Sequence, residues 1–523
     1  MSKLNYGFIS KKMKEGLTML KKLLCLLLCV ILASSVLVLT ACEDEGGDAS
    51  NENSDAVSQG ETGIHSGFIP EVKDWGGVEV NILTYDMDYI FSTCQVEAVE
   101  VTDEPINDAF FERNAIIEDR FGITIKAHYP EGDEDFIQVM RDDMQSGLNQ
   151  YDALVSQIVY ATPLVSEGNL IDFNSIKNGY LQLDKEWWDQ TLQKDISLNG
   201  KNFFITGDAL VEDDQATWAI YFNKDLIKTH NLADPYTLVK EGKWNLDTMH
   251  EMLQHVDLTH GAQKSYDPKV GDQWGMVAQS YDYYQFMQGC GQRLIDNTGE
   301  KPVIRIDDQR NLEVYFKLAE IIFDFENVGV ADHHGPWNSG VYGQRIEIFA
   351  NGNALFMPSS ISTVSEELIR NAEIRYGILP MPKADDLQDS YTTAVNVYHY
   401  SVFCIPITNV NKLDVTCYAM EAMAYYGKQL VTPEYYDRTL TLKRFADEES
   451  AEMLDLIFRN RTYDMGAVFD FTNAGAGSGT LYFYTTLLGD KDNKGAKIMS
   501  VLESKRPVYQ AGIDMLVEQC FND

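Results

Sequence analysis

Basic residues are scarce in this sequence. It contains 42 Lys and Arg against 80 Asp and Glu, which gives a formal net charge of −38 at neutral pH. A surface of this sign repels the phosphates of nucleic acids and of anionic lipids. We therefore expect no nucleic-acid partner, whereas neutral or cationic small ligands remain compatible with the composition.

Cysteine is also sparse and shows no pattern of pairing. None of the eight cysteines lies in a Cys-x-x-Cys or Cys/His spacing, so neither a zinc site nor a disulfide framework is predicted. Cys25 and Cys29 belong to an N-terminal apolar segment, and Cys42 follows that segment. The other five are expected to be small buried hydrophobes: Cys94, Cys290, Cys404, Cys417 and Cys520.

Motifs for catalysis, metals and phosphates are missing as well. There is no Gly-x-Ser-x-Gly nucleophile. The glycine-rich stretch Asn473–Gly479 lacks the Gly-Lys-Ser/Thr ending of a phosphate loop, and His333-His334 has no further ligand at metal-binding spacing. The adjacent Asp213 and Asp214 could accept ligand hydroxyls or form a glycosidase pair, but such a pair needs a defined separation. We expect a protein that is not an enzyme and holds neither cofactor nor metal.

The N-terminus carries an export signal. The apolar run Leu23–Leu39 follows Lys21-Lys22 and ends in Leu-Thr-Ala-Cys42. The run is long enough to span a membrane, so a single anchoring helix is the alternative. Leu-Thr-Ala-Cys resembles the lipobox of bacterial lipoproteins, which implies removal of residues 1–41, acylation of Cys42 and attachment to the outer face of a cytoplasmic membrane.

Residues 42–70 are predicted to be a disordered tether, because they are acidic and rich in Gly, Ser and Asn. The chain beyond the signal has about 480 residues, too many for a single core, so two or three domains are expected.

The first part of the folded body alternates between strand and helix patterns. Strands are predicted at 78–84, 123–128 and 151–155, helices at 105–121 and 135–148, and further strands at 202–208 and 216–222. This order predicts an α/β fold with a parallel sheet covered by helices. Ligands of such sheets bind outside the carboxyl ends of the strands, which places Tyr85, Asp86 and Tyr160 at a candidate site.

A family resemblance appears at Trp218–Leu226. The sequence Tyr-x-Asn-Lys-Asp-Leu, ending a strand and opening a helix, resembles the hinge crossover of extracytoplasmic solute-binding proteins of ABC importers. The nearest branch is the carbohydrate-binding, maltose-binding-protein-like family 1, in which the residue matching Asn223 caps the following helix. Further matches occur in the same chain order at 151–155 with 163–172, 243–249, 349–357 and 375–382.

The resemblance implies a two-lobe, type II periplasmic-binding-protein fold with a cleft between the lobes. Lobe 1 is expected to comprise residues 71–215 and 355–410, and lobe 2 residues 216–354 and 411–523. A monomer would close by a hinge on a carbohydrate and deliver it to ABC permease subunits.

Sugar rings stack on aromatic faces, and their hydroxyls need fixed polar partners. The residues expected to bind the ligand are therefore aromatic, acidic or hydroxyl side chains: Tyr85, Asp86, Tyr160, Asp214, Trp218, Trp274, Tyr283, Trp337 and Ser359. Three alternatives remain open: the same fold with a non-sugar solute, a surface polysaccharide hydrolase, and an adhesion or signalling lipoprotein.

Overall fold

The computed structural model describes residues 63–68, 70–85, 96–130, 135–256, 264–299, 301–331, 339–441, 448–469 and 497–521. The predictions for the signal, the lipidated Cys42, most of the tether, Asp86, Trp337 and Cys94 fall outside these residues. Within the described ranges, no helix combines the length and the hydrophobicity needed to cross a bilayer.

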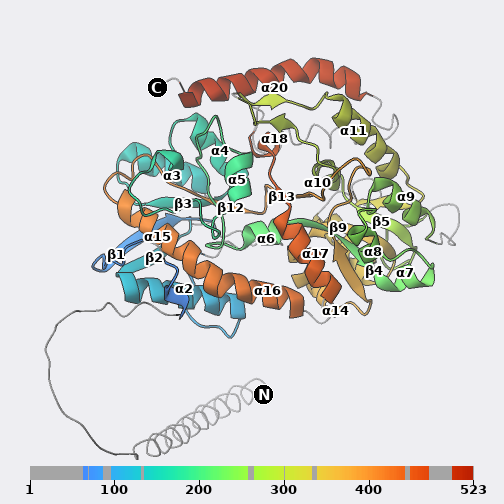
Figure 1. Ribbon diagram of the computed structural model, residues 1–523, viewed down its shortest axis with the longest axis horizontal. Coiled ribbons are helices and arrows are strands. Elements are labelled where there is room, and N and C mark those ends of the chain that lie inside the picture. Colours follow the sequence, from blue (N-terminus) through green and yellow to red (C-terminus); the bar gives the residue numbers. More distant parts are fainter. Residues whose placement is uncertain are drawn as a thin grey trace, which may run out of the picture. The chain divides into compact units, whose positions relative to one another are not determined.

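The first sheet contains three parallel strands and one antiparallel strand (Figure 1). β1 pairs in parallel with β2 and β3, and β12 pairs antiparallel with β3. This confirms the predicted parallel sheet. We call this sheet and the helices packed on it lobe 1; its strands are β1 (Val78–Leu83), β2 (Ile123–His128), β3 (Ala153–Gln157) and β12 (Ser401–Cys404), and its helices include α2 (Pro105–Phe121), α3 (Phe136–Ser146) and α4 (Ile158–Ser166).

The second sheet has five strands in the order β10-β4-β9-β5-β8. β5 is parallel to β8 and β9, whereas β4 runs antiparallel to β9 and β10. We call this sheet and its helices lobe 2; its strands are β4 (Trp218–Asn223), β5 (Trp274–Ala278), β8 (Val328–Val330), β9 (Ala354–Ser360) and β10 (Tyr376–Leu379), and its helices include α9 (Leu246–Gln254), α10 (Asp282–Gly289), α11 (Gln309–Ile322) and α13 (Ser339–Ala350).

The lobe boundaries differ from the prediction. Residues 355–410 were assigned to lobe 1, but β9 and β10 pair on either side of β4 in lobe 2, with Trp218 opposite Ser360 and Asn223 opposite Tyr376. Conversely, α15 (Leu413–Tyr426) was assigned to lobe 2 but packs on β1 and α2 in lobe 1. The assignment was wrong at these positions because strand pairing, rather than chain order, decides which sheet each segment joins.

Capping residues set the ends of the helices near the site. Glu104 accepts a hydrogen bond from the Asn107 amide, Pro105 opens α2, and Gly122 closes it with φ of 60°. The Asn223 side chain accepts from the Asp225 and Leu226 amides at 2.9 and 3.1 Å and so caps α7 (Lys224–Thr229). The predicted capping role of Asn223 is confirmed.

The described helices and strands show three passages of the chain between the lobes. The first leads through α6 (Glu212–Ala216) into β4, the second through β11 (Thr393–Ala394) into β12, and the third from α16 (Thr432–Thr441) on lobe 1 to α17 (Glu448–Arg459) on lobe 2. Thr217 forms an antiparallel bridge with Val395, and β11 pairs with β13 (Arg461–Thr462). The first two crossovers are therefore bonded to each other where they leave the lobes.

Candidate functional site

Two of the predicted site residues meet at the carboxyl edge of lobe 1. Tyr85 follows β1, and its hydroxyl lies 2.7 Å from the hydroxyl of Ser401. The Tyr85 ring centroid lies 5.5 Å from that of Phe136, which lies 6.5 Å from that of Tyr160. Tyr85 is buried and Tyr160 half-buried. The ends of β1 and β3 thus bring these two tyrosines to one aromatic cluster, as their positions predicted.

The corresponding edge of lobe 2 is centred on Tyr281, which lies just beyond the end of β5. Its ring makes an edge contact with Trp218, 6.1 Å between centroids, and another with Tyr398 at 6.2 Å. Its hydroxyl donates to Asn396 Oδ1 at 3.0 Å. Because Asn396 and Tyr398 belong to the second crossover, Tyr281 connects lobe 2 with the segment that enters lobe 1.

Four buried polar side chains at these edges have no hydrogen-bond partner in the described structure. They are Thr84 after β1, Trp218 at the start of β4, Gln285 in α10 and Tyr400 before β12. The indole N–H, both amide atoms and the two hydroxyls are all unpaired. An unmade hydrogen bond of a buried group costs about 1–3 kcal/mol, and most native polar groups avoid it. Such groups are partners that a bound ligand can satisfy.

Tyr400, Gln285 and Asn396 were missed by the sequence reasoning. The dense aromatic run Tyr398-His-Tyr400, directly before a strand, was the available signal for the tyrosines. For Gln285 the sequence offered none, because its burial and its missing partners depend on the tertiary structure.

Three other predicted residues lie within lobe 2. Trp274 is 1% exposed and contacts Tyr266, and the Tyr283 hydroxyl donates to the Tyr315 carbonyl. Ser359 is fully buried, and its hydroxyl bonds to Thr363 at 2.7 Å and to Arg345 at 3.2 Å. These contacts explain Trp274, Tyr283 and Ser359 as packing residues; their contact with a ligand stays a prediction.

An ion pair fixes the backbone around Tyr281. Arg345 and Asp282 are both 0% exposed and lie 3.3 Å apart. Asp282 also accepts from the Gln279 amide, and Arg345 donates to the Pro358 carbonyl at the end of β9. The pair therefore joins the β5–α10 turn, which carries Tyr281, to the neighbouring strand.

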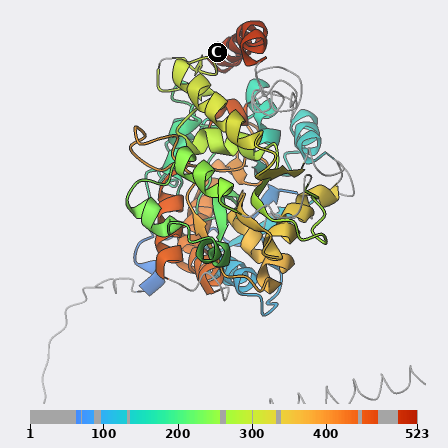
Figure 2. The same cartoon turned by 90° about the vertical axis from the view of Figure 1, so that its right-hand side faces the viewer.

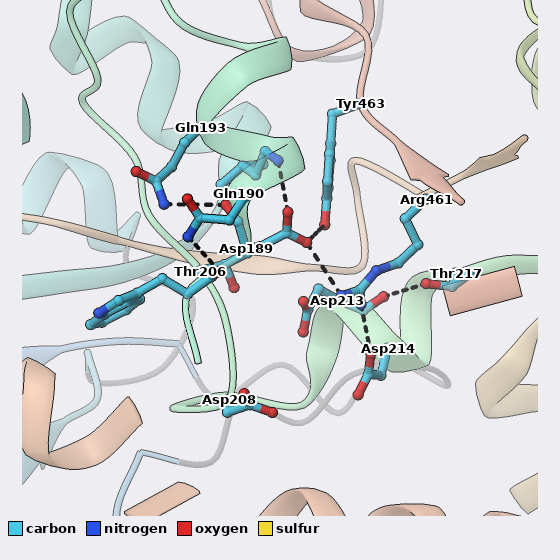
Figure 3. A network of polar contacts seen from close by, with 12 residues as sticks. Asp189, Gln190, Gln193, Thr206, Asp208, Asp213, Asp214, Thr217, Arg461 and Tyr463 are labelled. Carbon is cyan, nitrogen blue, oxygen red and sulfur yellow. Dashed lines mark hydrogen bonds and ion pairs between the residues drawn. The ribbon is translucent and has the colours of Figure 1, made fainter. Parts of the chain in front are cut away.

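The predicted pair Asp213 and Asp214 lies in a separate polar network at the first crossover (Figure 3). Arg461 Nη1 contacts Asp213 at 3.1 Å and Asp214 at 2.6 Å, and its Nη2 contacts Asp189 of lobe 1 at 3.3 Å. The Tyr463 hydroxyl donates to Asp189 at 2.7 Å. One guanidinium thus holds lobe 1, the first crossover and β13 together, which gives Asp214 a structural role here; ligand binding by Asp214 stays a prediction.

These carboxylates line a cavity of about 190 Å³, together with Trp187, Trp188 and Asp208. Burial raises the pKa of Asp208 to about 6 and, despite Arg461, raises the pKa of Asp213 and of Asp214 above the usual range. No group of three metal-ligating side chains with metal-site geometry occurs in the described residues. The network joins lobe 1, the first crossover and β13 through charged side chains.

Comparisons with known proteins give matches of structure alone. No protein-family model matches the sequence, and no curated protein matches it. UgpB from Mycobacterium tuberculosis, solved with glycerophosphocholine, is 14% identical, with a TM-score of 0.52 over 84% of this chain and 98% of UgpB. The galacto-N-biose-/lacto-N-biose I-binding protein of the ABC transporter from Bifidobacterium longum, solved with lacto-N-biose, is 10% identical, with a TM-score of 0.51 over 86% and 98%.

M. tuberculosis UspC gives a TM-score of 0.50 at 15% identity, over 83% of this chain and 100% of UspC. At these identities the likeness shows the fold. The chain has the α/β periplasmic-binding-protein fold, with two mixed sheets flanked by helices, and the fold class predicted from the sequence is confirmed.

Proposed function

We propose that this protein is a lipid-anchored, extracytoplasmic solute-binding protein that captures a carbohydrate and delivers it to an ABC permease. The lobes close on the ligand around the crossovers, and Cys42 carries the anchor. The protein performs no catalysis.

The observation that carries this proposal is the set of unpartnered polar groups beside the aromatic cluster. Trp218 Nε1 and the hydroxyls of Tyr400 and Thr84 lie at strand ends of the two sheets, and the Gln285 amide lies in α10, the helix that follows β5. These groups are neutral donors and acceptors, and burial holds the pKa of Tyr400 well above its usual value, so it remains a phenol. Neutral polar groups beside tyrosine faces suit the hydroxyls and C–H faces of a sugar.

The structural neighbours support the solute class without fixing it. The B. longum protein was solved with lacto-N-biose and UgpB with glycerophosphocholine. Both ligands carry several hydroxyl or ester oxygens. A non-sugar polyol or phosphodiester on the same residues is therefore the second candidate.

The test is titration calorimetry of the purified protein against a glycan panel and glycerophosphocholine. We expect 1:1 binding of a glycan with no turnover after prolonged incubation. Binding of only peptides, polyamines or metal ions would reject the carbohydrate assignment, and hydrolysis of a glycan would reject the non-catalytic one.

A substitution then locates the site. Trp218→Phe keeps an aromatic ring and removes an unpaired N–H, so the glycan should bind about 3- to 10-fold more weakly, as expected for the loss of one hydrogen bond. Trp244→Phe is the matched control, because the Trp244 N–H already donates to the Pro380 carbonyl inside lobe 2. Equal losses of glycan affinity in the two variants would show that the Trp218 N–H does not bind the ligand.

A further inference from the structure

The C-terminal helix α20 (Ile498–Phe521) lies across both lobes (Figures 1 and 2). It contacts α4 in lobe 1 and strand β7 (Val303–Ile304). β7 forms a hairpin with β6 (Ile295–Asp296) in the connection between α10 and α11, two helices of lobe 2. The helix therefore links the lobes without being one of the chain crossovers.

The first part of α20 is bonded to lobe 2 by side chains. Arg506 Nε donates to Asp307 at 2.6 Å, and Gln510 Oε1 accepts from the Ile304 amide at 3.3 Å. The ion pair and the hydrogen bond are within five residues of each other, so this region is held at two points.

The last part of α20 is bonded to lobe 1. Lys201 Nζ donates to the Cys520 carbonyl at 2.6 Å. Leu516, Val517 and Cys520 are buried on the same part of the helix. This end of α20 leaves lobe 1 when this hydrogen bond and the apolar contacts of these three side chains are broken.

A second contact between the lobes lies at the β6–β7 hairpin. The Asn297 side-chain amide donates to the carbonyls of Lys194, Asp195 and Ser197, at 3.2, 2.7 and 3.3 Å. These residues belong to α5 (Gln190–Asp195) and the turn that follows it. Trp188, just before α5, packs on Phe403 of β12 in lobe 1. When the lobes open, this contact must break, and one end of α20 must lose its contact with its lobe.

We propose that α20 is a releasable strap, which holds the two lobes together and lets them separate when its C-terminal end leaves lobe 1. The lobe 2 end stays attached through Arg506 and Gln510. The strap rests on the proposed function, because it controls the opening that hinge closure requires. It acts in the ligand-free protein, so its test does not depend on which ligand binds.

Spin labels measure the separation of the lobes directly. Leu387 in lobe 2 and Val410 in lobe 1 are 84% and 75% exposed, and both are replaced by Cys in a background lacking Cys42, Cys94 and Cys520. Cys520 is removed because it lies on the end of α20 that is proposed to detach, whereas Cys290, Cys404 and Cys417 are buried and remain. Double electron–electron resonance then gives the distance distribution between the labels.

Lys201→Ala removes the bond from lobe 1 to α20 and should raise the population of the longer distance about fivefold, as expected for one lost hydrogen bond. Lys177→Ala is the matched control, because Lys177 also donates to a backbone carbonyl, that of Asn174, but within lobe 1. Equal distributions in the wild type, Lys201→Ala and Lys177→Ala would overturn the proposal.

Hydrogen exchange on the unmodified protein gives an independent readout. The amides of 511–521 should exchange faster than those of 501–510, because only the C-terminal end is released. Deletion of residues 511–523 should shift the distance between the spin labels to the longer value. Cooperative melting of the truncated protein shows that it is still folded. Uniform exchange along α20 also contradicts the proposal. So does a truncated protein that folds and keeps the wild-type distance between the labels.

Discussion

The buried carboxylates near Arg461 predict how the free energy of unfolding depends on pH. Asp208 is 15% exposed, lies 3.6 Å from Lys428 and accepts a hydrogen bond from Thr432 at 2.6 Å. Burial nevertheless raises its pKa to about 6, from 3.8. The folded protein therefore binds a proton here more tightly than the unfolded chain does.

The sign follows from proton linkage. Between pH 4 and 6 the folded state holds more protons than the unfolded state, so the free energy of unfolding falls as pH rises through this window and then levels off. A pKa difference of about two units corresponds to at most about 3 kcal/mol. Asp213 and Asp214, with raised pKa values, contribute with the same sign.

Asp208→Asn removes this titration and can keep the bond from Thr432. We expect the free energy of unfolding of the variant to exceed that of the wild type by about 1–2 kcal/mol at pH 7.5 and to equal it at pH 4. The gain is smaller than about 3 kcal/mol because the variant also loses the ion pair with Lys428. Urea unfolding at half-unit pH steps measures this difference. Asp184→Asn, on the surface of lobe 1, is the control and should show no such pH dependence of the difference. The reasoning is refuted if the Asp208→Asn difference is the same at both pH values.

Two further changes test the packing around the site. Arg345→Met removes the buried cation that faces Asp282 and should lower the free energy of unfolding by about 3–5 kcal/mol, measured by urea unfolding. The double variant with Asp282→Leu should recover most of this loss, and a double variant as unstable as the single one would contradict the reasoning. Asn223→Ala removes the cap of α7 and should cost about 1 kcal/mol, measured by the same unfolding assay, while Asn223→Asp should retain most of the stability; equal losses in both would show that capping is not the cause.

The local elements could be predicted because their signals are local. Pro105 and Gly122 bracket α2, and Asn223 marks the start of α7, so these boundaries were close to those observed. A strand expected at 202–208 forms only isolated bridges, such as Ile205 with Phe403, because no neighbouring strand pairs along its length. The sequence does not show which partner a short buried segment will find.

The same limit explains the outcome for the site. The shared edge position of Tyr85 and Tyr160 could be predicted because strand order sets it; their contact with a ligand stays a prediction. The buried positions of Arg345 and Arg461 could not be predicted, since an arginine buried among carboxylates looks the same in the sequence as one on the surface. The position of β9 in lobe 2 depends on pairing with β4, more than a hundred residues earlier, which no local pattern encodes.

The edge strand β12 has a consequence for biosynthesis. Ser401 pairs with Gln157, so more than two hundred residues separate the two neighbours in the first sheet. As the ribosome makes the protein, β3 has an unpaired edge until nearly four fifths of the chain exists, while all five strands of lobe 2 are complete at residue 379. The sheet of lobe 2 can therefore form before that of lobe 1 is complete, and a newly made chain is most prone to aggregate through β3 during that interval.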